Sequence, residues 1–238
     1  GDRTTTWSTL GFDSLVLNVN QDSASNVVVT SGSGILIGGN SVAATINILN
    51  SGTVSSTDQS AIAAGSGANV GSINIFSGST VSVSSSGQVA IDLTASNSSS
   101  VFTISNTGTI SSLEVAIFGG SGFEIVTNNA NGVITGNIDL GDNNDQLSNA
   151  GTITGNVSLG ADTDTFSNSG TLNGTIDLGS GNDSATLTTG QSITGSFNAG
   201  DGTDTLTLAG TGVVDLDFSV ITNFEVLTKT DSGGWTIR

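Results

Sequence analysis

The chain has 238 residues but no Cys, Pro, Met, Tyr or His. Without Cys, the sequence excludes a disulfide scaffold, a thiol nucleophile and a Cys-based metal site. Without His, Tyr or Cys, the acid–base groups available for catalysis reduce to Asp and Glu, and a Ser nucleophile would lack its usual His base. We therefore expect that the chain is not an enzyme. The lack of Pro fits a fold in which most strands lie inside a ladder and need every backbone N–H.

Positive charge is almost absent, because Arg3, Lys229 and Arg238 are the only basic residues and the formal net charge is −17. Nucleic acids and anionic lipids are recognised through Lys and Arg, so neither is an expected partner. No apolar run approaches the roughly 20 residues of a membrane-spanning helix, so we expect no membrane insertion of this fragment. The first residues do not resemble a signal peptide, and any targeting segment is expected to have been removed or left out.

A sequence repeat dominates residues 138–208. Four segments with nearly the same pattern occupy residues 138–147, 157–166, 176–185 and 197–206. Each has an Asp at the same position, and these residues are Asp145, Asp164, Asp183 and Asp204. A constant period near 20 residues indicates one structural unit per repeat, which must stack on its neighbours to bury its apolar side.

Within each repeat, apolar residues alternate with Ser, Thr and Asn in short runs separated by Gly, as is typical of strands. We predict an all-β fold, a single parallel β-helix (solenoid) of about ten coils of roughly 19–30 residues, with three strands per coil. Equivalent positions should then stack. We expect Leu147, Ile153, Val157 and Leu159 to pack on Phe166, Leu172, Ile176 and Leu178 of the next coil.

The organisation along the chain divides into four regions. We expect an N-terminal cap that includes Trp7, with the first strands, in residues 1–25, and irregular coils with loops in residues 26–137. Regular coils of 19–21 residues should occupy 138–210, and a C-terminal cap 211–238. Loops inserted at residues 63–70 and 94–100 should emerge on one face, where binding usually occurs.

Four bends have the form Asn-x-Gly and begin at Asn50, Asn106, Asn149 and Asn168. If they stack at one corner, their amides can hydrogen-bond from coil to coil as a ladder. The alternative is that Asn is present because it tolerates turn geometry.

The repeated Leu-Gly-x-Gly-x-Asp and Asn-x-Gly-Thr-Ile-x-Gly patterns, followed by residues 221–229 and 235–237, resemble the passenger domain of bacterial autotransporters (type V secretion). The resemblance implies a single right-handed parallel β-helix displayed on, or secreted from, a Gram-negative cell, with a role in adhesion or virulence. It implies an outer-membrane β-barrel beyond the C-terminus in the full-length protein. It also implies an autochaperone-like C-terminal segment, for which Phe224, Glu225 and Trp235 are our candidate folding-cap residues.

Calcium is a possible cofactor, although we expect none. Residues 179–183 and 200–204 match part of the Gly-x-Gly-x-Asp core of calcium-binding β-roll repeats. Stacking would place Asp145, Asp164, Asp183 and Asp204 in one column, where a bridging cation would relieve their repulsion. The doubled Gly and the second nonapeptide of those repeats are missing. We therefore favour the interpretation that these Asp residues cap solvated turns through side-chain-to-backbone bonds.

The predicted fold is a stiff rod whose outer faces are rich in Ser, Thr and Asn, and such faces are suited to adhesion. We expect a non-enzymatic adhesin whose partner is the protein itself, or a host surface protein or glycan. A released ligand for a host-cell receptor and a structural stalk are the alternatives.

Overall fold

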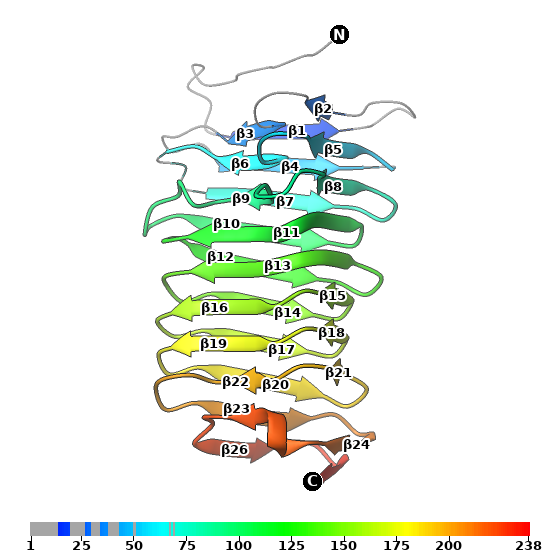
Figure 1. Cartoon of the computed structure of the whole chain (residues 1–238), viewed down its shortest axis with the longest axis vertical. Helices are drawn as coiled ribbons and strands as arrows, with labels where there is room; N and C mark the ends of the chain where they lie inside the picture. The colour runs from blue at the N-terminus through cyan, green and yellow to red at the C-terminus, as the bar shows by residue number, and fades with distance from the viewer. Residues whose placement is uncertain are drawn as a thin grey trace.

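The computed structural model describes residues 14–19, 27–29, 34–37, 43–49, 51–66, 68 and 70–238. In these residues the chain winds into a stack of short strands along one long axis, with β1 (Ser14–Val19) and β26 (Val226–Lys229) toward opposite ends of the stack (Figure 1). Every strand pairing among them is parallel and joins one coil to the next. The prediction of an all-β parallel β-helix is confirmed.

One side of the stack is a ten-stranded sheet. Its strands, in spatial and chain order, are β1 (Ser14–Val19), β4 (Ala43–Ile48), β7 (Val70–Ile75), β10 (Val101–Asn106), β12 (Phe123–Asn128), β14 (Gln146–Asn149), β17 (Thr165–Asn168), β20 (Ser184–Thr188), β23 (Thr205–Ala209) and β26 (Val226–Lys229). Each coil contributes one strand, so the predicted number of about ten coils is confirmed over the described residues.

The other two sides belong to a second sheet that bends around a corner. One of them contains β2 (Val27–Val29), β5 (Thr53–Ser56), β8 (Thr80–Val83), β15 (Thr152–Thr154), β18 (Thr171–Asn173) and β21 (Ser192–Ile193). The other contains β3 (Ile35–Ile37), β6 (Ile62–Ala64), β9 (Val89–Asp92), β16 (Val157–Ala161), β19 (Ile176–Ser180), β22 (Phe197–Asn198) and β25 (Ile221–Thr222). The long strands β11 (Thr109–Gly120) and β13 (Val133–Gly141) supply both sides of their coils. The prediction of three strands per coil is confirmed.

The core is a set of apolar columns inside the coils. Because side chains alternate along each strand, every second residue points inward and lies on its counterpart one coil away. Leu147 pairs with Phe166, and Ile153 pairs with Leu172. Val157 pairs with Ile176, and Leu159 and Leu178 occupy equivalent positions in the same register, two residues further along these strands. All eight side chains are buried, so the predicted packing columns are confirmed.

Coils are longer in the N-terminal half of the described chain than in the C-terminal half. Paired side chains are 27 residues apart at Asn47 and Asn74, but 19 residues apart at Asn149 and Asn168. The longer coils place their extra residues between β6 and β7 and between β9 and β10, where loops were expected. The two loops share one corner, because Ser100 Oγ donates to the Ala68 carbonyl at 2.5 Å. The predicted cap residue Trp7 lies outside the described residues.

Glycine is required where successive coils approach most closely at a corner. Gly141, Gly160, Gly179 and Gly200 have φ angles of 99°, 114°, 108° and 99°, in the left-handed region that favours glycine. A Cβ on Gly160 would lie 1.8 Å from the carbonyl oxygen of Gly141 in the preceding coil. The repeated Leu-Gly pattern therefore reflects both backbone conformation and coil-to-coil contact.

We predict that Gly160→Ala destabilises the protein much more than Gly190→Ala. Gly190 also has a positive φ, of 98°, but a Cβ there would meet nothing within 4 Å. Gly190→Ala should cost about 1–2 kcal/mol, the usual cost of placing a Cβ in the left-handed region. Gly160→Ala adds a steric clash and should lower the free energy of unfolding at least twice as much in urea titrations. Equal losses would show that coil contact does not explain the glycine column.

Candidate functional site

The outward side of the ten-stranded sheet presents two uncharged columns of side chains, which we call the hydroxyl face. One column is paired from coil to coil in the order Asn47, Asn74, Ser105, Thr127, Ser148, Ser167, Thr186, Thr207 and Thr228. The neighbouring column runs Thr45, Ser72, Thr103, Ile125, Gln146, Thr165, Ser184, Thr205 and Val226. All of these side chains are at least partly exposed. The face therefore consists almost entirely of hydroxyl and amide groups.

Negative charge lies elsewhere on the coils. Asp142, Asp162 and Asp201 are exposed at turns, and the exposed Asp177 lies on β19, on another side of the stack. A neutral strip on a chain whose net charge is −17 is the most distinctive surface feature of the described residues.

A buried amide column stabilises one corner. Asn106 Nδ2 donates to Asn128 Oδ1 at 2.9 Å, and the same bond recurs at 2.8 Å from Asn128 to Asn149 and from Asn149 to Asn168. An amide offers both a donor and an acceptor, so identical residues satisfy one another along the stack. The ladder is confirmed for Asn106, Asn149 and Asn168, whereas Asn50 lies outside the described residues. The sequence pattern missed Asn128, because two additional residues separate it from Gly132.

A second polar column contains only acids, and we call it the acid column. Its members are Glu124, Asp145, Asp164, Asp183, Asp204 and Glu225. Each residue from Glu124 to Asp204 donates its backbone N–H to the carboxylate of the next member, over 2.6–2.8 Å. These five residues are at most 2% exposed. The expected side-chain-to-backbone bonds are present, but the expectation of solvated turns is wrong, because the alternation of the strand directs the Asp side chains inward.

Burial dominates the electrostatics of the acid column. It raises the pKa of Asp145 to about 9 and that of Asp164 to about 7, with neighbouring carboxylates adding to the shift. It also raises the pKa of Glu124 to about 7 and that of Asp183 to about 6. The backbone N–H that each carboxylate accepts lowers its pKa, but less than burial raises it. One oxygen of each Asp, Oδ2, is buried without a hydrogen-bond partner.

The calcium hypothesis concerns four of these residues, and the structure brings Asp145, Asp164, Asp183 and Asp204 together in one column as expected. In the part of the chain that the structure describes, no group of three or more acidic side chains is arranged to hold a metal ion. One oxygen of each Asp is already used by a backbone N–H. The expectation of no cofactor stays a prediction, with calcium binding as its alternative.

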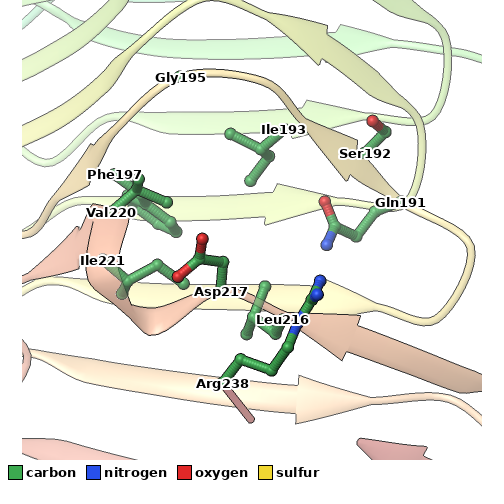
Figure 2. Close-up of a pocket in the computed structure, with 10 residues that line it drawn as sticks. All are labelled: Gln191, Ser192, Ile193, Gly195, Phe197, Leu216, Asp217, Val220, Ile221 and Arg238. Atoms are coloured by element: carbon green, nitrogen blue, oxygen red, sulfur yellow. The ribbon is translucent and has the colours of Figure 1, made fainter. Parts of the chain in front are cut away.

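A small cavity of about 200 Å³ lies near the C-terminal end (Figure 2). It is lined by Gln191, Ser192, Ile193, Gly195, Phe197, Leu216, Asp217, Val220, Ile221 and Arg238. It forms because β24 (Val213–Leu216) does not continue the column of β21 but pairs with β27 (Gly234–Ile237) in a separate two-stranded sheet. Asp217 caps the short 3₁₀-helix η1 (Phe218–Val220), and hydrogen bonds from Ser219 lower its pKa. The Asp217 carboxyl therefore has a structural role.

The candidate folding-cap residues close this end of the stack. The half-buried Phe224 ring packs edge to face on Phe197, with ring centroids 5.0 Å apart. Glu225 is exposed but accepts the Asp204 N–H, so it ends the acid column. Trp235 lies in β27, packs partly against the core, and has a buried indole N–H without an acceptor.

Comparison with models of protein families, with curated proteins and with solved structures found no match. The resemblance to autotransporter passengers is therefore still a prediction. Among the described residues, no helix is both long and apolar enough to cross a membrane.

We predict that Phe224→Ala and Trp235→Ala each lower the free energy of unfolding by about 1–3 kcal/mol, because each removes a large, partly buried side chain from the end of the core. Refolding from urea, followed by Trp fluorescence for Phe224→Ala and by circular dichroism for Trp235→Ala, should also become slower. Val213→Ala is the control, because Val213 is 83% exposed in the same cap and should change stability by less than about 0.5 kcal/mol. Unchanged stability and refolding of both cap variants would exclude a folding-cap role.

Proposed function

We propose that this chain is the rod-shaped passenger of an exported bacterial surface protein. It acts as a non-enzymatic adhesin that associates with further copies of itself through the hydroxyl face. The observation that carries the proposal is the neutral strip along the ten-stranded sheet of a strongly acidic rod. The exported location, on or secreted from a Gram-negative cell, rests on the sequence resemblance of residues 138–208 and 221–237.

Charge favours this face over the other sides of the rod. Two copies that each carry −17 repel one another, and the repulsion between exposed charges is screened over about 10 Å at 0.1 M salt. Side-by-side contact through the hydroxyl face keeps exposed acids such as Asp142, Asp162 and Asp177 out of the interface. Ser, Thr and Asn can donate and accept hydrogen bonds, so the same face is complementary to a second copy of itself.

The dimensions indicate weak, reversible association. Nine stacked positions at about 4.8 Å and strands of about 13 Å give a face on the order of 500 Å². Two such faces would bury on the order of 1,000 Å², at the lower end of specific protein interfaces. Many copies displayed on one cell would add their weak contacts by multivalency.

The proposal excludes catalysis because the chemistry of the chain offers little for it. The acids of the acid column with raised pKa values are buried, and the Asp residues among them accept backbone N–H groups. Solvated acids such as Asp142 and Asp162 have no His, Tyr or Cys with which to share acid–base work.

We predict concentration-dependent, reversible self-association in sedimentation velocity experiments, strengthened by added NaCl because salt screens the repulsion between acidic rods. The double variant Ser148→Asp with Ser167→Asp adds two charges to the hydroxyl face and should weaken association at least tenfold. The matched control, Thr154→Asp with Asn173→Asp, adds the same charge at exposed positions of the same two coils on another side. It should associate nearly as the parent does.

Equal loss in both double variants would show that net charge, and not the hydroxyl face, controls association. A chain that stays monomeric at every concentration and salt level would contradict self-association. The function would then be contact with a host receptor or glycan, or a structural stalk.

A further inference from the structure

The hydrogen bonds of the acid column satisfy only part of its buried carboxyl groups. In each of Asp145, Asp164, Asp183 and Asp204, Oδ1 accepts a backbone N–H from the preceding coil. The Oδ2 atom of each is buried without a partner, and the Glu124 carboxyl is buried with only the Gly120 backbone N–H acting to lower its pKa. An ionised carboxylate in such a place is strongly unfavourable unless something neutralises it.

The charged groups that act on the column are themselves acidic. Members of the column repel one another, and Asp142, Asp162 and Asp177 add repulsion from the turns and from β19. Of the two basic residues in the described part of the chain, Lys229 donates to the Asp231 carbonyl and Arg238 lines the cavity of Figure 2. Neither contributes to the pKa of Glu124, Asp145, Asp164 or Asp183.

A proton is the ligand that fits this geometry. Protonation at Oδ2 removes the charge and leaves Oδ1 free to accept the backbone N–H that links the coils. A metal ion would need several oxygens around one point, whereas the described residues include no such group of acids.

We propose that the acid column is a proton-binding column, in which several carboxyls of the folded chain are held as neutral acids near neutral pH and make the stacked coils more stable in acid than in alkali. This inference does not depend on the proposed adhesion.

The raised pKa values support the direction of the effect. The groups concerned are Glu124, Asp145, Asp164 and Asp183. In the unfolded chain they have ordinary pKa values, 3.8 for Asp and 4.5 for Glu, whereas their folded values are about 6 to 9. The folded state therefore keeps protons that the unfolded state has lost, and unfolding releases them. The contribution of these bound protons to the free energy of unfolding is fully present below about pH 4. It decreases as the pH rises and is lost once the pH has passed the folded pKa values.

The experiment begins with the unmodified chain. Unfolding it by urea in weakly buffered solution at pH 6 should release about three protons, from the groups whose folded pKa lies above that pH: Glu124, Asp145 and Asp164. Urea midpoints measured from pH 4.5 to 9 should fall steadily. No proton release, or midpoints that rise with pH, would overturn the proposal.

Variants then assign the effect to the column. Asp164→Asn keeps the Oδ1 acceptor but cannot ionise. Unfolding of this variant should release one proton fewer than unfolding of the parent chain. Between pH 4.5 and 7, its unfolding constant should therefore rise about tenfold less per pH unit than that of the parent. Asp201→Asn removes an exposed acid from a nearby turn and should leave the slope unchanged. If Asp164→Asn does not fold, Asp183→Asn is the substitute, with the same effect up to about pH 6.

The last part of the experiment tests whether calcium, and not a proton, neutralises the acid column. Adding CaCl₂ at pH 8 should leave the urea midpoint of the parent chain unchanged relative to EDTA. A midpoint that rises with calcium in the parent but not in Asp164→Asn would overturn the proposal, because a cation would then be the ligand of the column. Equal slopes in the parent, Asp164→Asn and Asp201→Asn would overturn it as well.

Discussion

The hydrogen bonding between one coil and the next is the constraint on which the rest of this structure depends. Parallel pairing at a spacing of about 4.8 Å places each residue directly over its counterpart, so every column must be compatible with copies of itself. Apolar residues meet this condition by packing, as Leu147 does on Phe166. Glycine meets it where backbones approach too closely for a Cβ, as Gly160 does above Gly141.

Polar columns meet the same condition in different ways. The Asn column is self-complementary, because each amide donates to the next and accepts from the previous one. The acid column is not, because a carboxylate has no donor and its neighbours repel it. It is tolerated because one oxygen of each Asp accepts a backbone N–H and, in our account, because protons neutralise the second oxygen. On the outside of the coils, the same stacking produces the neutral hydroxyl face. The stacking of equivalent residues therefore accounts for the core, the polar columns and the proposed contact surface.

Much of this fold could be predicted from the sequence, because a constant period makes equivalent positions visible. The 19-residue spacing identified the columns that contain Ile153 and Leu172, and Asn-x-Gly bends identified the amide ladder through Asn149. Asn128 was missed because an insertion before Gly132 hides the pattern. The burial of Asp164 was also missed, because Asp in a Gly-rich stretch is typical of solvated turns, and the inward direction depends on the alternation of the adjoining strand. The partner could not be predicted, since uncharged hydroxyl columns carry no specific chemical signature.

The most direct measurement of the central claim is infrared spectroscopy of the folded chain at neutral pH, with isotope-labelled Asp. The account predicts a carbonyl-stretch band of protonated carboxylic acid in the folded protein, which disappears on unfolding and becomes weaker in Asp145→Asn. If the labelled groups gave only carboxylate bands in the folded state, the column would be ionised. Another source of neutralisation, such as a bound cation, would then have to hold these coils together.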